Sequence, residues 1–496
     1  MNAVSLPKKN QSVVWITVIL LGAFALGNVY AITRDFWWLS LLPLGLGMVA
    51  FALLKPNQFW LVMVLLTPFS VTLDVGEIGA SLTLPTEPFI AFFMILVVMK
   101  FLLENKIDWK ILKHPITIII ILQLAWMLVS SAASTMPMVS FKYFLSRLWY
   151  VVVFYFFGIQ VFKDLKKIDQ YNWFYLVAMC LVILYTLVRH YFENFSHEYS
   201  YKASLPFFKD HNIYAVIVAF FIPVALIYAL KARTLKVSFI RGLMYYAIGF
   251  IFLVGVVASY TRAAWVSLGV ALIMYVALRL RLRLRTLLAS LAAVCLIVMA
   301  SWTDIMLSMS KNKAESDSNL DSHVQSIYNV TSDDSNTERL NRWNAALRMF
   351  EERPVFGFGP NTYQFKYAPY QLSHQKTRIS TNLGDLGNAH SEFIGPLAEM
   401  GLLGALLVIA LMLAAIRAAM HIFYEPSSER IKYLALIALL AFMTYYSHGL
   451  LNNYLDTDKA NVCFWATMAM ITALEVHHNK KGTNAGQEES TALDKP

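Results

Sequence analysis

Long apolar runs alternate with short polar loops along most of the chain. A helix needs about 20 predominantly apolar residues to cross the hydrocarbon core of a bilayer, and most of the runs approach that length. The strands of a membrane barrel would instead alternate apolar and polar residues over short segments. The pattern therefore predicts an all-α, polytopic integral membrane protein with about 12 to 14 transmembrane helices. The predicted spans are residues 13–31, 37–54, 58–73, 88–104, 114–132, 147–163, 172–189, 211–230, 242–259, 263–279, 286–303, 401–421, 432–449 and 460–475.

One polar interruption, residues 304–390, is too long to be a simple connection. Its first half, Lys311–Asn336, is rich in Ser, Asp and Asn, which is typical of a mobile segment. In its second half, Thr337–Glu351 has apolar residues at helical spacing, which predicts an amphipathic helix, and a turn rich in Gly and Pro follows at Pro354–Pro360. The apolar positions of this helix are Leu340, Trp343, Leu347 and Phe350. We expect the helix to lie on the membrane face and to cover a cavity between the spans.

These elements divide the chain into four regions. We expect N-terminal transmembrane helices over residues 1–303 and a large loop region over 304–400. We expect C-terminal transmembrane helices over 401–475 and a polar tail over 476–496.

The charge distribution orients these regions. Hydrophobic residues make up 58% of the chain and charged residues only 15%, with a net charge of +10, whereas about a quarter of a soluble domain is charged. Loops rich in Lys and Arg alternate with loops nearly bare of them, and the basic loops belong in the cytoplasm. This rule places both termini in the cytoplasm and the 304–390 loop on the opposite face, which in a bacterium is the periplasm. Because the basic residues are scattered over the loops, we expect no nucleic-acid partner.

The candidate chemistry lies at the outer ends of the spans, where ionisable residues are costly and usually functional. His390 stands at the border between the large polar loop and the apolar run 401–421, and an imidazole can accept a proton near neutral pH. Arg262 lies between two apolar runs on the same face; a guanidinium pairs with two phosphate oxygens at once, although an arginine there can also extend to the lipid headgroups.

Three further cations lie on this face. Arg339 is on the predicted amphipathic helix, and Lys202 is in a smaller outer loop; for each the alternative is an ordinary solvated side chain. Arg147, near the outer end of another span, is interpreted as a residue that extends to the headgroups.

Several chemistries lack their motifs. The chain has no His-Glu-x-x-His, no Walker glycine loop and no Cys-x-x-Cys pair. Its three cysteines, Cys180, Cys295 and Cys463, all lie in apolar runs. We therefore expect a site made of cations and one histidine, with no metal and no cofactor.

Three segments together resemble the O-antigen ligase/polymerase family of membrane glycosyltransferases. His390-Ser391, followed by nine residues, Gly401, two residues and Gly404, matches the ligase-type signature of that family. The segment Ser259–Trp265 resembles its arginine motif, and Glu338–Gly359 resembles the stretch that leads its long periplasmic loop. The resemblance extends over about residues 200–475.

The resemblance implies a GT-C-like architecture and a sugar transfer outside the inner membrane. The donor would be a glycan linked to undecaprenyl diphosphate, and the acceptor lipid A–core for a ligase or another repeat unit for a polymerase. His390 resembles the histidine that activates the acceptor hydroxyl, and Arg262 resembles a diphosphate-binding arginine. Lys202 occupies the place nearest to the second essential arginine of the family; a lysine neutralises phosphate but lacks the planar fork.

We therefore expect an O-antigen ligase with a metal-independent, inverting mechanism. Arg262, Lys202 and Arg339 would hold the diphosphate, and His390 would take the proton of the attacking hydroxyl. A polymerase that uses the same donor stays open as an alternative, and a protein-glycosylating ligase is a further one. A glycolipid transporter is less favoured, because transporters usually bind their substrate at mid-bilayer between repeated halves.

Overall fold

The computed structural model describes residues 8–75, 80–104, 108–301, 334–376, 380, 387–425 and 428–478. The chain forms two compact units, Met1–Val62 and Met63–Pro496, which are described separately.

The first unit consists of apolar helices. α1 spans Lys8–Ile32, and a 3-10 turn at Trp37–Leu41 leads into α2, Leu42–Leu54. The proline in the first turn of α2 fits there because that position needs no N–H donor. α3, Pro56–Leu66, begins in this unit and ends in the second. The apolar runs 13–31 and 37–54 therefore form helices as predicted.

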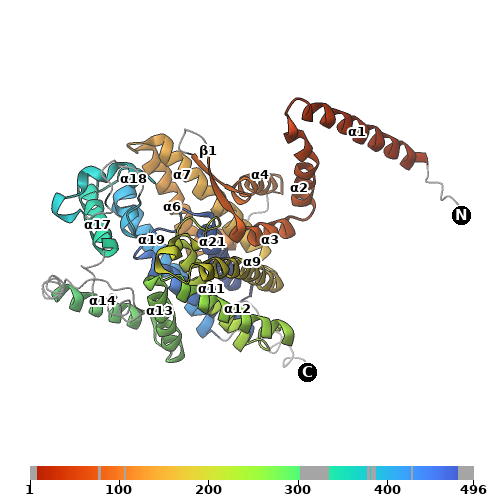
Figure 1. The fold of residues 1–496 in the computed structure, drawn as a ribbon. Coiled ribbons are helices and arrows are strands. Elements are labelled where there is room, and N and C mark those ends of the chain that lie inside the picture. The colour runs from red at the N-terminus through yellow and green to blue at the C-terminus, as the bar shows by residue number, and fades with distance from the viewer. Residues whose placement is uncertain are drawn as a thin grey trace, which may run out of the picture. The chain divides into compact units, whose positions relative to one another are not determined.

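The second unit is almost entirely helical (Figure 1). Its strands are β1, Val71–Val75, and β2, Ala80–Leu84, which pair antiparallel. Its helices before the large loop are α4 Thr86–Glu104, α5 Trp109–Leu112, α6 Pro115–Ala132, α7 Pro137–Tyr150, α8 Phe157–Val161, α9 Leu165–Phe192, α10 His197–Ala203, α11 His211–Leu230, α12 Phe239–Ala258, α13 Arg262–Arg279 and α14 Leu284–Ala300. The later ones are α17 Asp334–Glu352, α18 Tyr363–Lys366, α19 Ile394–Tyr424, α20 Glu429–Gly449 and α21 Asp458–Ala473.

Nine of the described helical segments are long and apolar enough to cross a membrane, which confirms a multi-pass α-helical protein. At the centre of the second unit lies α21, every residue of which is buried (Figure 1). An ion pair opens this helix: Lys459 Nζ lies 3.3 Å from Asp458 Oδ1, and Ser70 and Thr86 donate hydrogen bonds to the same carboxylate. Buried charges need such partners, so these bonds attach the β1–β2 region to the helical core.

The predicted spans 58–73 and 147–163 are not regular α-helices throughout. Residues 58–73 are not one helix: α3 ends at Leu66, a 3-10 turn contains Pro68, and the chain continues as β1. Proline lacks an N–H donor and its ring clashes within a helix, which explains the break. The predicted span 147–163 is the second half of a longer helical segment, Pro137–Val161, whose middle is a π-helical turn at Val151–Phe156.

The predicted amphipathic helix exists as α17, which packs against the start of α19 (Figure 1). Its buried face differs from the prediction: Leu347 is 43% exposed, whereas Ala346 and Met349 are fully buried against Phe358 and Tyr363. The helix also carries a buried ion pair, Glu338–Arg342, which an apolar pattern does not reveal. Of the segment Lys311–Asn336, residues 311–333 lie outside the described residues.

The turn after α17 is bound to the beginning of α19. Three backbone hydrogen bonds connect them: Phe358 N to Ala398 O (3.0 Å), Gly359 N to Glu399 O (2.8 Å) and Leu402 N to Pro354 O (3.0 Å). They need α19 to break at Gly401, which has φ +67°. A Cβ at Gly401 would lie 2.1 Å from the Val355 carbonyl oxygen, so only glycine fits. This clamp positions the segment that contains His390.

Candidate active site

His390 precedes α19, on a segment bound to the turn after α20. Its backbone is left-handed (φ +50°), and its N–H donates to Asn388 Oδ1 at 3.1 Å. The next two N–H groups bind the α20 side: Ser391 N donates to Asn453 Oδ1 (2.8 Å), and Glu392 N donates to Gly449 O (2.8 Å). These bonds set the direction of the imidazole.

The imidazole itself is held by Asn452. His390 Nδ1 lies 2.9 Å from Asn452 Oδ1. An amide oxygen only accepts hydrogen bonds, so this contact places the proton on Nδ1 and the lone pair on Nε2. The described part of the chain makes no hydrogen bond to Nε2. The ring therefore has the tautomer that a proton acceptor needs.

The surroundings of His390 disfavour its charged form. Burial lowers the pKa of His390 to about 4, and the positive charges of Arg342 and Arg339 act in the same direction. The hydrogen bond that Nδ1 donates to Asn452 and the charge of Asp210 act against them. The imidazole is therefore neutral at neutral pH.

Two arginines of α17 lie beside this histidine. Arg342 is only 5% exposed; its Nε donates to Glu338 Oε1 at 2.9 Å and its Nη1 donates to Asn388 O at 3.0 Å. Arg339 Nε donates to Leu451 O at 3.2 Å, next to the residue that holds the imidazole. Arg342 is buried and Arg339 is half-buried. The sequence alone does not distinguish the two, since both lie on the same predicted helix and a solvated face suits one of them.

Arg262 and Lys202 lie on neighbouring segments. Arg262 is the first residue of α13, which packs against α20, and it is half-buried. Two residues earlier, the Tyr260 hydroxyl donates to Phe195 O at 2.8 Å, and the Tyr260 ring contacts His197 at 5.3 Å. His197 begins α10, which carries Lys202 as an exposed residue.

The contacts thus connect Arg262 with the helix of Lys202, and Arg339 with the surroundings of His390. Asp210, which follows the loop of Lys202, contributes to the electrostatic surroundings of His390. Arg189, which the sequence did not single out, holds this loop: its guanidinium donates to Ala203 O (3.2 Å) and the Tyr199 hydroxyl (2.9 Å).

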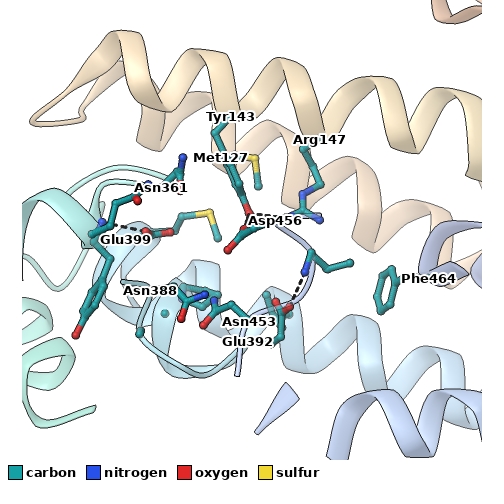
Figure 2. Close-up of a pocket in the computed structure, with 18 of the residues that line it drawn as sticks. Met127, Tyr143, Arg147, Asn361, Asn388, Glu392, Glu399, Asn453, Asp456 and Phe464 are labelled. Carbon is teal, nitrogen blue, oxygen red and sulfur yellow. Dashed lines mark hydrogen bonds between the residues drawn. The ribbon is translucent and has the colours of Figure 1, made fainter. Parts of the chain in front are cut away.

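A cavity of about 810 Å³ lies next to the His390 segment. Asn388, Ala389 and Glu392 form part of its wall, while His390 itself does not. Tyr143 and Arg147 project from α7 on one side, with Asn388, Glu392 and Asn453 across from them (Figure 2). No described residue of α17 lines this cavity; Asn361, Tyr363 and Gln364, which follow that helix, do.

The prediction that Arg147 extends to lipid headgroups is wrong. The side chain is 8% exposed and lines the cavity. Its Nη1 donates to Asn461 Oδ1 at 3.1 Å and its Nη2 donates to the Tyr143 hydroxyl, which in turn donates to Asp456 Oδ1 at 3.2 Å. Arg147 therefore faces the protein interior, where a polar network replaces its hydration.

Within the described residues, no three His, Cys, Asp or Glu side chains lie close enough together to hold a metal ion. The polar groups near His390 are cations and amides instead.

Residues 247–409 match the family model described as O-antigen ligase. The match runs from α12 to the first half of α19 and includes Arg262, Arg339 and His390. Lys202 and Asn452 lie outside it. A search of curated proteins found no match.

Proposed function

From the match of residues 247–409 to the O-antigen ligase family model, we propose that the chain transfers a glycan from undecaprenyl diphosphate to lipid A–core. The observation that carries the proposal is a neutral imidazole, fixed in one tautomer by Asn452, with Arg339 and Arg342 beside it. A base next to fixed cations suits a reaction in which a hydroxyl loses a proton while a diphosphate leaves.

His390 is the proposed base and begins the reaction. Nε2 takes the proton of the acceptor hydroxyl as its oxygen attacks the anomeric carbon of the donor. The bond from that carbon to the diphosphate oxygen breaks, and the lipid diphosphate leaves with the electron pair. Direct displacement inverts the anomeric carbon. The proton then passes from His390 to the solvent or to the departing diphosphate.

Arg262, Lys202 and Arg339 are the proposed diphosphate-binding residues. Fixed positive groups stabilise the negative charge that grows on the leaving group. Of these, Arg339 lies closest in the bonding network to His390, through the adjacent residues Leu451 and Asn452. Arg262 lies at the N-terminus of α13, where the helix dipole adds to the attraction for an anion.

The donor also tunes the base. With a pKa of about 4, the free imidazole is a weak acceptor, because a base works best with a pKa near the operating pH. The negative diphosphate offsets the charges of Arg339 and Arg342, which hold that pKa down. Donor binding would therefore raise the pKa of His390, so the imidazole is a stronger base in the donor-bound enzyme than in the free enzyme.

The proposed location is the bacterial inner membrane, with the site at the periplasmic face and both termini in the cytoplasm. The alternation of basic and nearly uncharged loops supports this orientation. We also propose that the chain is organised in four regions, with boundaries at residues 303, 400 and 475.

The direct test is transfer by the purified protein in nanodiscs, with undecaprenyl-diphosphate-linked glycan and lipid A–core as substrates. We expect His390→Ala to lower the rate by about 100- to 10,000-fold, the usual contribution of a general base. His421→Ala is the matched control, because His421 lies at the other end of the same helix, where it is half exposed. Full transfer by His390→Ala would exclude the proposed base.

A polymerase would use the same donor and differ only in its acceptor. A strain that lacks the gene separates the two activities. Loss of a ligase leaves long lipid-linked polymer unattached, whereas loss of a polymerase leaves single repeat units.

A further inference from the structure

The cavity beside His390 has the size of a ligand site. Its volume of about 810 Å³ falls within the roughly 300–1,000 Å³ of small-molecule sites. Its walls come from α6, α7, α19 and α20, from the loop before His390, and from the turn that ends at Asp456. The cavity is therefore built from segments far apart in the sequence.

The wall combines apolar side chains with many hydrogen-bonding groups. Carboxyl groups, amides, phenols and one arginine alternate around it (Figure 2). Among these are Glu392, Glu399, Asp456, Asn361, Asn388, Asn453, Tyr143, Tyr445 and Arg147. Phe464 and Trp465 add aromatic surface. Such a combination of polar groups and aromatic faces suits a molecule with many hydroxyls and apolar ring faces.

The charge of the wall argues against a diphosphate. The described lining residues include two cations, Arg147 and Lys209, against four carboxyl groups, Asp210, Glu392, Glu399 and Asp456. Burial raises the pKa of Glu392 and of Asp456, so these groups hold a proton more readily and can donate as well as accept. Neither Arg262, Arg339 nor Arg342 lines the cavity.

One lining group has no partner of its own. Tyr446 is 6% exposed, and its buried hydroxyl makes no hydrogen bond within the described chain. An unpaired buried hydroxyl costs about 1–3 kcal/mol, so a ligand hydroxyl that reaches this phenol would be stabilised by it.

We propose that this cavity binds the uncharged, hydroxyl-rich sugar portion of a substrate, separately from the diphosphate. The proposal rests on the proposed function for the identity of the sugars. Asn388 and Glu392 each lie two residues from His390, and Asn453 adjoins Asn452, so a sugar in the cavity lies directly beside the base. The sugars belong either to the acceptor or to the donor glycan.

The test measures binding apart from transfer. The probes are delipidated core oligosaccharide and O-glycan released from its lipid diphosphate, titrated calorimetrically into the full-length protein in nanodiscs. We expect one of them to bind, and Tyr446→Phe to weaken that binding by about 2- to 10-fold, as for the loss of one hydrogen bond. Asp456→Asn, which keeps an oxygen for Tyr143, tests a second wall group. Steady-state kinetics should show a raised KM for the same substrate.

The matched control is Tyr214→Phe. Tyr214 is also a buried phenol of a membrane-spanning helix, but it does not line the cavity. It should leave both Kd and KM unchanged. If the cavity variants weaken binding of the core oligosaccharide only, the cavity binds the acceptor. If they weaken binding of the O-glycan only, it binds the donor.

The outcomes separate the two proposals. Sugar binding that depends on Tyr446, in a protein that transfers nothing, supports the cavity site and refutes the transferase. If the wild type transfers the glycan but Tyr446→Phe and Asp456→Asn leave sugar binding and KM unchanged, only the cavity site is refuted. No binding of either sugar by the wild type also refutes it.

Discussion

At the scale of single residues, the central arrangement is a histidine whose protonation is controlled from both sides of the ring. Asn452 holds Nδ1 and leaves the lone pair on Nε2. Burial is the main cause that lowers the pKa of His390; Arg342 and Arg339 lower it further, and Asp210 opposes them. A negative ligand beside the arginines would therefore raise the pKa and strengthen the base.

This balance predicts two different pH dependences for the transfer rate. The pH profile of kcat/KM reports the free enzyme, so its acid limb should fall only below about pH 5, as His390 with a pKa of about 4 becomes protonated. The profile of kcat reports the enzyme with donor bound, so its acid limb should lie at higher pH, because the diphosphate raises the pKa. If the acid limbs of the kcat/KM and kcat profiles fall at the same pH, the bound donor does not raise the pKa of His390.

Asn452→Asp provides the control for this prediction. A carboxylate at 2.9 Å from Nδ1 would stabilise the imidazolium, so both acid limbs should move to higher pH. Asn452→Ala should instead lower kcat without such a shift of the limb toward higher pH. Because burial also raises the pKa of Glu392 and Asp456, carbon-13 NMR of labelled histidine, assigned with His390→Gln, should identify the group that titrates.

At the scale of elements, the clamp between the turn 354–359 and the start of α19 organises the site. The three backbone hydrogen bonds across it need the break at Gly401, and they hold the helix that follows His390. Gly357 lies in the same contact: a Cβ there would lie 2.3 Å from the Glu399 carbonyl carbon. Gly357 and Gly401 therefore act through backbone packing rather than through chemistry.

Gly401→Ala should destabilise the protein by at least about 1–2 kcal/mol, because the left-handed conformation is unfavourable for alanine and its Cβ meets the Val355 carbonyl. The melting temperature in detergent measures the loss, and cleavage of the 354–359 turn by protease should become faster. Gly269→Ala is the control, since Gly269 lies in α13 with open space around it and should be neutral or slightly stabilising. Equal melting temperatures for the two variants would contradict the clamp.

At the scale of the whole molecule, loops and turns from distant parts of the chain gather beside His390. The loop after α9, the segment before α19 and the turn after α20 all contribute charges or hydrogen bonds to its surroundings. The buried helix α21 stands at the centre of the same unit. The chemistry is therefore proposed at one end of a helical bundle, with the lipid-facing surface of the helices around it.

The proposed orientation predicts which face of the membrane each loop reaches. Glu351→Cys, on an exposed position of α17, should react with a membrane-impermeant thiol reagent in cells whose outer membrane alone is opened. Arg283→Cys, in the basic turn before α14, should react only after the inner membrane is opened. The described native cysteines Cys180 and Cys463 are buried and give little background. The reverse labelling pattern would place the site in the cytoplasm and remove the lipid-diphosphate donor from reach.

The hydrophobic pattern alone determined that this is a multi-pass helical membrane protein, because about 20 apolar residues in a row have few other uses. Spacing also located α17. The places of His390, Arg262 and Arg339 on the predicted outer face, together with the family resemblance, made them candidates. Only the tertiary structure decided that Asn452 holds the imidazole, that Arg342 and Arg147 are buried, and that α21 is central. These depend on contacts between residues as far apart as 62 and 314 positions, as for His390–Asn452 and Arg147–Asn461. No local pattern encodes such contacts, because a buried charge and a surface charge have the same spacing along a helix.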